Sequence, residues 1–338
     1  MRQSSSKQGR LTRRRFLTIC AAAVPGLSLS TIAAQALGTA RLHRWRGIAL
    51  GAGAEINLVH HDAAQAQDLF AGIETEIRRL EAIFSLYRPE SELVRLNAHG
   101  RLPAPSPELL DLLSLCRSMQ AATGGAFDPT VQPLWDHYAR RAAGAPAEDF
   151  EAARQACGFR HVSVQPEEIS FTRPGMAMTL NGIAQGFVTD RITDFMAAHG
   201  CRDMVVDIGE IAARGAAPGE TLGGDTGWPV TLCPDPNHPD GRTDIRLDRA
   251  AVASSARQGT TFDQAGTRSH ILDPVTGLPV DSGLAGASVL AQSAAVADGL
   301  STAALVCGEH RLASALDRFS AARAFVVRDD GSCGWIES

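Results

Sequence analysis

The chain has 338 residues, a formal net charge of −5 at pH 7 and 44% hydrophobic residues, enough to bury a large core. Its only lysine is Lys7, which excludes a Schiff-base lysine or a P-loop lysine in the remainder, so phosphate groups must be held by Arg, backbone N–H groups, hydroxyls or a metal ion. The seven cysteines include no Cys-x-x-Cys pair, which argues against a zinc site.

The first 36 residues are typical of an export signal. They carry six basic residues and no acidic one, followed by an apolar run over 16–29 that is too short for a membrane span and is interrupted by a Pro-Gly pair. Thr12-Arg-Arg-Arg-Phe-Leu17 resembles a twin-arginine signal; a basic Sec-type leader is the alternative and reaches the same compartment. We expect cleavage near Ala36 and a periplasmic mature chain, 37–338, without a stable membrane span.

Removal of the signal changes the charge of the protein. The mature chain loses six positive charges and no negative charge, so its net charge falls from −5 to −11, and nucleic acid is excluded as a natural partner. Six cysteines remain in an oxidising compartment that permits disulfides. Cys116 and Cys307 nevertheless lie in apolar helical runs, which favours small buried residues at these two positions.

The first half of the mature chain predicts a strand followed by two capped helices. Residues 47–59 alternate as a strand, and Asp62 then caps an amphipathic helix that continues to Phe84. Ser106 caps a second helix with Pro107 in its first turn, and Gly124-Gly125 ends it. A further helix is expected over 147–156, and strands are expected over 161–164, 169–172 and 176–180.

The second half predicts more strands and three helices. The helix after Gly182 ends near His199-Gly200. Strands are expected over 204–208, 229–233, 243–247 and 250–254, then a helix that carries Asp298, a helix over 311–319 and a strand over 324–327. Strands and helices mix without a strict βαβ rhythm, which predicts an α+β fold with mixed sheets and packed helices.

Two segments predict a metal-assisted site for a phosphorylated ligand. In 176–190 an apolar run turns at Asn181-Gly182 into a helix, so the turn offers backbone groups to a ligand; an ordinary strand-turn-helix connection is the alternative. Asp298 and Thr302 are four apart, so a helix places a carboxylate and a hydroxyl on one face for a hard cation. The alternative is a polar turn near a helix start.

Six stretches, in order, carry a family resemblance over nearly the whole chain after the first forty residues. They are 84–97 (FSLYRPESELVRLN), 123–130 (TGGAFDPT), 176–190 (MAMTLNGIAQGFVTD), 205–210 (VVDIGE), 270–277 (HILDPVTG) and 297–302 (ADGLST). With these stretches the sequence resembles the ApbE-type FAD:protein FMN transferases. Within that family it is similar to the NosX-like branch that accompanies nitrous oxide respiration.

The resemblance implies two lobes around a cofactor cleft and a Mg²⁺-dependent reaction. Such an enzyme splits the FAD pyrophosphate, attaches FMN to a Thr or Ser of another protein and releases AMP. The branch implies that the acceptor is a membrane-attached, periplasm-facing electron-transfer flavoprotein of the nitrous oxide reductase system. For the metal, the resemblance adds the backbone carbonyl of Gly182 to Asp298 and Thr302, and these oxygen donors suit Mg²⁺.

The resemblance also assigns residues to the flavin. Tyr87 supplies an aromatic face, and Ala126, Phe127 and Asp128 contact the cofactor from the loop after Gly124-Gly125. A boundary tyrosine after a core helix is the alternative for Tyr87. His270 precedes a strand that ends in a turn, where it handles a proton or orients a phosphate; the alternative is a hydrogen-bonded strand-end residue.

Three positions depart from many relatives, which carry Asp before Leu-Gly-Gly-Ile-Ala-Lys-Gly. This chain has Thr179 for that Asp, Asn181 for the first Gly and Gln185 for the Lys. Thr179 and Gln185 still hydrogen-bond the cofactor but without charge assistance, and we interpret them as marks of the branch. Two other functions stay open: an FAD pyrophosphatase that gives FMN and AMP, and a non-catalytic FAD-binding carrier or assembly chaperone.

Overall fold

The computed structural model describes residues 17–19, 40–146, 149–218, 226–263, 266 and 268–337. The predicted export signal therefore falls almost wholly outside the described residues, apart from the short strand β1 (Leu17–Ile19). Among the described residues, no helix is both long and apolar enough to cross a membrane.

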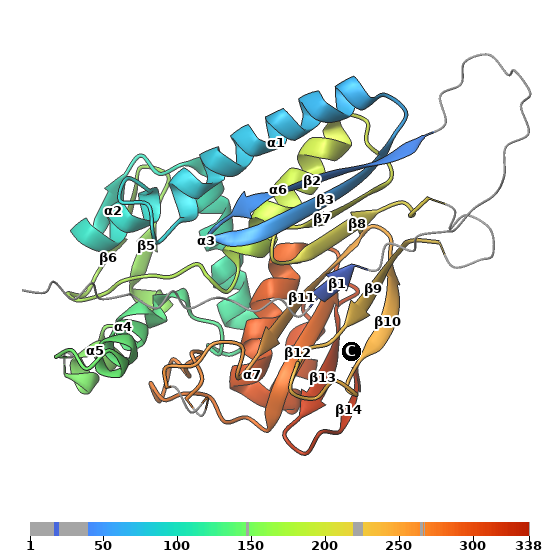
Figure 1. Cartoon of the computed structure of the whole chain (residues 1–338). Helices are drawn as coiled ribbons and strands as arrows, with labels where there is room; N and C mark the ends of the chain where they lie inside the picture. Colours follow the sequence, from blue (N-terminus) through green and yellow to red (C-terminus); the bar gives the residue numbers. More distant parts are fainter. Residues whose placement is uncertain are drawn as a thin grey trace, which may run out of the picture.

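An eight-stranded sheet forms the centre of the fold (Figure 1). Its strand order is β14-β13-β12-β11-β8-β7-β3-β2. The strands are β2 (Arg41–Ala49), β3 (Ala52–His60), β7 (Met204–Asp207), β8 (Ile211–Arg214), β11 (Ala250–Ala256), β12 (Leu284–Ala291), β13 (Arg323–Arg328) and β14 (Cys333–Ile336). Every neighbouring pair in this sheet is antiparallel. The α+β prediction is therefore confirmed, but the sheet is purely antiparallel and not mixed as the sequence suggested.

Two small antiparallel sheets flank the large one. In the first, β9 (Trp228–Leu232) pairs on one side with β10 (Thr243–Leu247) and on the other with β1. The second is built from β4 (Arg101–Pro103), β6 (Glu168–Phe171) and β5 (Val162–Val164). Most of these strands agree with the predicted positions to within one or two residues.

Three helices cover one face of the large sheet: α1 (Ala63–Phe84), α6 (Ala184–Ala198) and α7 (Ala294–Leu316), with α6 packed against both others (Figure 1). The remaining helical elements are α2 (Glu92–His99), α3 (Pro107–Ala122), α4 (Gln132–Ala142), α5 (Phe150–Gln155) and the 3-10 turns η1 (Pro129–Val131) and η2 (Phe159–His161).

The central strands of the large sheet are buried on both faces. In β7, Met204 and Val206 join the core beneath the helices, whereas Val205 points to a second core with Trp228 of β9. This alternation is the expected result of a strand's two-residue period. The helix-covered core is the larger of the two and extends from α1 to α7.

The predicted helix caps are confirmed. The side chain of Asp62 accepts hydrogen bonds from the backbone of Ala64 and Gln65 at the start of α1. Ser106 accepts from Leu109 N at the start of α3, with Pro107 as the first helical residue. Gly124 and Gly125, directly after α3, have φ of 59° and 86°, which favour glycine.

Several elements differ from the prediction. The strand expected over 47–59 is a hairpin, because β2 and β3 meet at a turn where Leu50 and Gly51 have positive φ. The helix expected over 311–319 is the end of α7, set off by non-helical backbone at Gly308. Not predicted were α2, α4, the 3-10 turns η1 and η2, and the strands β1, β4, β8, β12 and β14. Strand β12 is fully buried and rich in small residues, so its sequence, LAGASVLA, lacks a polar alternation.

All six described cysteines are free, so the structure contains no disulfide among them. Cys116 is buried on α3 as predicted, whereas Cys307 on α7 is only partly buried. Burial raises the pKa of Cys157 to about 12 and that of Cys307 to about 11, which keeps both thiols protonated at neutral pH.

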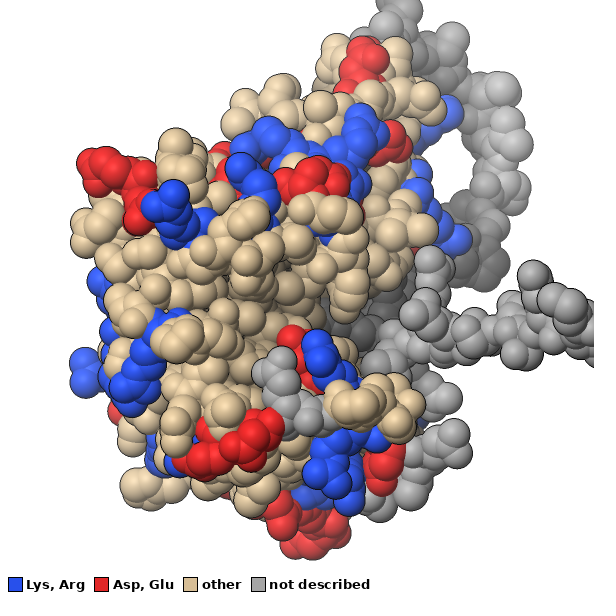
Figure 2. Space-filling model, turned by 90° about the vertical axis from the view of Figure 1, so that its left-hand side faces the viewer, with Lys and Arg blue, Asp and Glu red and all other residues tan. Residues whose placement is uncertain are grey.

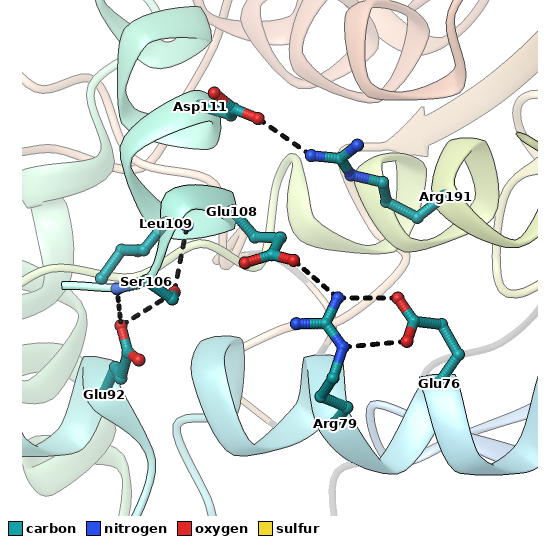
Figure 3. Close-up of polar contacts among 8 residues, drawn as sticks. All are labelled: Glu76, Arg79, Glu92, Ser106, Glu108, Leu109, Asp111 and Arg191. Atoms are coloured by element: carbon teal, nitrogen blue, oxygen red, sulfur yellow. Dashed lines mark hydrogen bonds and ion pairs between the residues drawn. The ribbon is translucent and has the colours of Figure 1, made fainter.

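Polar contacts join the helices that surround α3 (Figure 3). Arg79 of α1 pairs with Glu108 of α3 at 2.6 Å and with Glu76 at 2.7 Å, and these carboxylates raise its pKa. Arg191 of α6 pairs with Asp111 of α3 at 2.9 Å. Because these pairs are partly exposed, each contributes little to stability, and the buried cores hold the helices together.

Helices α6 and α7 approach each other most closely at Gly186. A Cβ atom on Gly186 would lie 2.2 Å from the backbone oxygen of Ala294 and 2.5 Å from its carbonyl carbon. These atoms are backbone and cannot move aside without shifting α7. The crossing therefore requires glycine at position 186.

Gly186→Ala should lower the free energy of unfolding by about 3 kcal/mol, the upper end of the cost of overpacking. The matched control is Gly72→Ala in α1, where the new Cβ would lie 2.9 Å from Cζ of Phe195, the far end of a flexible side chain. There the gain in helix propensity, about 1 kcal/mol, offsets the contact. Urea unfolding followed by circular dichroism measures both; equal effects would contradict the close crossing.

Candidate functional site

The segment 176–190 lies at the centre of the candidate site, and its first part is extended without belonging to a sheet. Met178 donates its N–H to Oδ1 of Asn97 and accepts from Nδ2 of the same side chain, both at 2.8 Å. Thr179 N donates to the Pro129 carbonyl at 2.8 Å. The predicted strand at 176–180 is thus wrong: an amide side chain and a loop carbonyl take the bonds that a neighbouring strand would make.

The turn after this stretch meets α7 at the residues predicted to bind metal. A Cβ on Gly182 would lie 3.1 Å from Oγ1 of Thr302, so Gly182 lies next to that hydroxyl group. The N–H of Gly186 donates to Oδ2 of Asp298 at 3.1 Å. The structure therefore brings Gly182, Asp298 and Thr302 together from segments more than 100 residues apart.

Asp298 is only 4% exposed, so the carboxylate is part of the packed junction between α6 and α7. The helical spacing of Asp298 and Thr302 does not predict this burial. It results from the close crossing at Gly186, which places α6 directly over the second turn of α7. Loss of the Asp298 side chain therefore removes a structural hydrogen bond as well as a candidate metal ligand.

Hydroxyl groups extend this junction to strand β11. Oγ of Ser255 lies 2.9 Å from Oγ of Ser301 and 3.4 Å from Oγ1 of Thr302. Ser301 also donates to the backbone oxygen of Asp298 at 3.0 Å. Sequence reasoning did not single out Ser255, because it lies just after the strand expected over 250–254 and nothing in the sequence indicated proximity to α7.

The donors at this junction suit a hard divalent cation. Asp298 offers a carboxylate and Thr302 a hydroxyl, and Gly182 lies next to that hydroxyl. Oxygen donors of this kind favour Mg²⁺ or Ca²⁺ over zinc or copper. Within the part of the chain that the structure describes, no three His, Cys, Asp or Glu side chains gather as a metal cluster. A cation here would depend on hydroxyl, backbone and ligand oxygens beside the single carboxylate.

The loop predicted to contact flavin is held firmly from within. Both oxygens of Asp128 accept hydrogen bonds: Oδ1 from the backbone and hydroxyl of Thr130 at 2.9 and 2.5 Å, and Oδ2 from Phe159 N at 2.9 Å and Gln120 Nε2 at 3.4 Å. Asp128 is 8% exposed, and Ala126 and Phe127 are buried as well. In this structure the Asp128 carboxylate shapes the loop.

A second anchor of this loop comes from α7. Nη2 of Arg311 donates to the carbonyl oxygens of Thr123 at 2.9 Å and Gly124 at 3.1 Å. The loop before Ala126 is therefore fixed to the same helix that carries Asp298 and Thr302. The sequence gave no signal for this contact, which spans 188 residues.

Tyr87 is 75% exposed, and its backbone N–H is fixed by Oγ of Ser85 at 3.1 Å. An aromatic ring at this exposure is available to stack on a ligand.

The face on the side of α2, α4 and α5 shows acidic and basic residues in small separate groups, with a largely uncharged band between them (Figure 2). That face offers no continuous basic surface of the kind that binds nucleic acid.

His270 lies in a loop that packs on α4 and α5. Its Nδ1 donates to the Thr260 carbonyl at 2.7 Å, and its backbone N–H donates to the same oxygen at 3.2 Å. With the Nδ1 proton engaged, the lone pair of the neutral ring is on Nε2. Two isolated bridges, Thr261 to Ser269 and Leu272 to Pro279, replace the expected strand. The expected turn after it is present, since Asp273 Oδ1 accepts from Val275 N at 2.7 Å.

Thr179 and Gln185 lie on either side of the turn. Oγ1 of Thr179 accepts from Asn181 N at 3.2 Å, which stabilises the turn locally. Gln185 is 6% exposed, and its amide packs against Gly209, where a Cβ would lie 2.4 Å from Nε2. Gly209 has a φ of 96° and closes the turn between β7 and β8. Gln185 thus connects α6 to this turn.

The chain is similar to proteins of one family. A family model described as the ApbE family matches residues 50–326. A FAD:protein FMN transferase of Vibrio cholerae is 32% identical over 254 residues, which cover 71% of this chain and 74% of that protein. One from Treponema pallidum is 28% identical over 316 residues, or 87% of each chain.

Solved structures share the fold. The flavin transferase ApbE from Vibrio cholerae has a TM-score of 0.74 at 24% identity and covers 88% of this chain and 96% of that chain. The apo form of the Pseudomonas stutzeri flavinyl transferase ApbE has a TM-score of 0.73 at 24% identity, over 89% and 97%. Because the family model spans most of the chain and the fold agrees over nearly its full length, this chain belongs to the ApbE family.

Proposed function

We propose that this chain is a Mg²⁺-dependent FAD:protein FMN transferase. The observation that carries the proposal is the junction at which Gly182 lies next to the Thr302 hydroxyl and the Gly186 N–H donates to the Asp298 carboxylate. It is supported by the curated relatives, which are named FAD:protein FMN transferases and align over most of the chain. FAD is then the substrate, and a second protein is the acceptor.

The reaction requires one bond to form and one to break. The hydroxyl oxygen of a Thr or Ser on the acceptor attacks the phosphorus of the FMN half of FAD. The bond from this phosphorus to the bridging oxygen breaks, AMP leaves with that oxygen, and the acceptor keeps FMN through a phosphoester. The hydroxyl proton goes to a base, and Nε2 of His270 is our candidate because its other nitrogen is fixed by Thr260.

Asp298, Thr302 and the carbonyl of Gly182 would hold Mg²⁺, which when bound offsets the negative charge of the pyrophosphate and of the departing AMP. The chain's own groups do the rest. The exposed ring of Tyr87 supplies a stacking face, and Ala126 and Phe127 supply an apolar wall on a loop that Asp128 keeps in shape. Thr179 and Gln185 order the turn and the start of α6 from either side.

We place this activity in the periplasm. The support is the sequence of residues 1–36, which resembles a twin-arginine export signal. The proposed acceptor is a membrane-attached electron-transfer flavoprotein of the nitrous oxide reductase system, and its support is the resemblance of segment 176–190 to the NosX-like branch. A mature charge of −11 keeps nucleic acid out of the list of partners.

The decisive assay incubates chain 37–338 with FAD, Mg²⁺ and the periplasmic domain of such a flavoprotein, and weighs the acceptor by mass spectrometry. We expect a mass gain of FMN less one water, release of AMP, and no gain in the presence of EDTA. An acceptor with its Thr changed to Val is the control. Free FMN without modified acceptor would identify a pyrophosphatase, and intact FAD would identify a carrier.

Asp298→Asn tests the metal ligand in the same assay, because the amide oxygen can still accept from Gly186 N while the negative charge is lost. Transfer should fall to the level seen with EDTA, and the melting temperature should change little. Asp298→Ala also leaves the Gly186 N–H without this acceptor, so it should cost about 1–3 kcal/mol of stability in addition. Normal, EDTA-sensitive transfer by Asp298→Asn would remove this residue from the metal site.

Tyr87→Ala and Asp128→Ala should separate binding from folding. Tyr87→Ala should weaken FAD binding by about 1–3 kcal/mol through loss of stacking, and should change stability by less than about 0.5 kcal/mol because the ring is exposed. Asp128→Ala should cost about 2–4 kcal/mol of stability, since Thr130 N and Phe159 N lose their buried acceptor. Titration calorimetry measures the FAD affinity, and urea unfolding measures the stability. Unchanged FAD affinity in Tyr87→Ala would show that Tyr87 is only a boundary residue after a core helix.

His270→Ala should lower the rate at saturating FAD by about 100-fold or more, with little change in the FAD dissociation constant. The physical reason is that the imidazole acts on a proton during the reaction and not on bound FAD. Steady-state kinetics with excess acceptor, together with fluorescence titration of FAD, separates the two effects. A raised KM at normal turnover would show that the imidazole only positions a phosphate.

A further inference from the structure

Asp190 binds the first turn of the helix that carries the proposed metal ligands. It lies on α6, partly buried, and its carboxylate reaches across to the start of α7. Oδ1 accepts from Ala294 N at 2.7 Å, and Oδ2 accepts from Ala295 N at 3.0 Å and from Oγ of Ser293 at 2.6 Å. The curated relatives' names and the function proposed above assign no role to this residue.

The start of α7 is capped mainly by Asp190. The first N–H groups of a helix have no intrahelical partners. In α7 Asp190 accepts from Ala294 N and Ala295 N, and the side chain of Ser293 accepts from Val296 N. The N–H of Ala297 already makes the first regular helical bond, to the backbone oxygen of Ser293. Two of these three capping bonds therefore come from α6, about 100 residues earlier in the sequence.

Two contacts, one helical turn apart on each helix, fix the position of Asp298. Asp190 is four residues after Gly186 on α6, and Asp298 is four residues after Ala294 on α7. Asp190 binds the α7 end at Ala294, and Gly186 N binds the Asp298 carboxylate at 3.1 Å. Between them the backbones touch at Gly186 and the Ala294 carbonyl. Sliding or rotation of α7 would break these contacts together.

We infer that Asp190 is a positioning residue for the metal site: it fixes the register of α7 against α6, so that Asp298 and Thr302 face Gly182 in the arrangement that binds the cation. The inference rests on the metal site of the proposed function. Asp190 itself does not contact FAD, acceptor or cation in this account. Groups that orient metal ligands in this way typically affect metal affinity by about 10- to 100-fold.

An amide cannot replace the carboxylate at this position. The two oxygens of Asp190 face N–H donors on both sides, Ala294 and Ala295. Asn has one acceptor oxygen and one NH₂ group, so one of the two N–H groups would face another donor. Asp190→Asn thus preserves the size of the side chain and disturbs the cap of α7.

The test measures Mn²⁺ affinity of FAD-free chain 37–338 by electron paramagnetic resonance, with Mn²⁺ as the probe for Mg²⁺. Asp190→Asn should weaken Mn²⁺ binding about 10- to 100-fold. Ser293→Ala should weaken it in the same direction by a smaller factor, because it removes a donor to Asp190 and the acceptor of Val296 N without changing the charge. FAD binding without metal should stay within about twofold of wild type, since metal-ligand orientation is the property that the substitutions change.

Two control variants separate positioning from general effects. Asp62→Ala removes the analogous cap of α1, which accepts from Ala64 and Gln65, and should lower the melting temperature without changing Mn²⁺ affinity. Asp194→Asn removes a negative charge one turn further along α6, from the surface pair with Arg214, and should leave Mn²⁺ affinity close to wild type. Wild-type Mn²⁺ affinity in Asp190→Asn, or an equal loss in either control, would overturn the inference.

Failure of the proposed function gives a different pattern. If wild-type protein binds Mn²⁺ at Asp298 but transfers no FMN, the metal site and the role of Asp190 stand and the proposed activity falls. If Mn²⁺ affinity is the same in wild type and in Asp298→Asn, the metal site itself is wrong, and the inference about Asp190 falls with it.

Discussion

The crossing of α6 and α7 is the constraint on which the candidate site depends. At Gly186 the two helices approach so closely that the backbone carbonyl of Ala294 occupies the place of a side chain. The same crossing buries Asp298 and lets the N–H of Gly186 hold its carboxylate. Close backbone contact of this kind leaves little freedom to slide, because packed interiors resist displacement. A carboxylate held in this way is preorganised before any ligand binds.

The turn before α6 is held in position by a few hydrogen bonds from distant parts of the chain. Extended backbone at Met178 is paired with the amide of Asn97, and Thr179 is bound to the Pro129 carbonyl. These contacts place Gly182 against Thr302 without the support of a neighbouring strand. Residues of three other motif stretches, 84–97, 123–130 and 297–302, thus lie against the segment 176–190. This explains how motifs so distant in the sequence form one site.

Much of the local structure follows from the sequence, because helix caps and turns depend on neighbouring residues. Asp62 and Ser106 cap the predicted helices, and Gly124-Gly125 ends the second of them. Strand β12 escaped prediction, since a strand buried on both faces and built of small residues has no polar alternation. The extended stretch at 176–180 was taken for a strand for the converse reason, as its hydrogen-bond partners come from elsewhere in the chain.

The sequence predicted the site only where the chemical nature and spacing of the residues indicate their role. Asp298 and Thr302 share one face of a helix by spacing alone, and the family resemblance added Gly182, which the structure places next to Thr302. The burial of Asp298, the hydroxyl of Ser255 and the cap supplied by Asp190 all depend on contacts across 40 to more than 100 residues. No local pattern encodes such contacts, because they arise from the packing of α7 on α6 and on β11.

Anomalous diffraction from crystals of chain 37–338 grown with FAD and Mn²⁺ tests the central claim most directly. The account predicts a manganese peak bound by Asp298, Thr302 and the Gly182 carbonyl, beside the pyrophosphate of FAD. FAD bound with its pyrophosphate elsewhere, or a manganese peak away from the junction of α6 and α7, would contradict it.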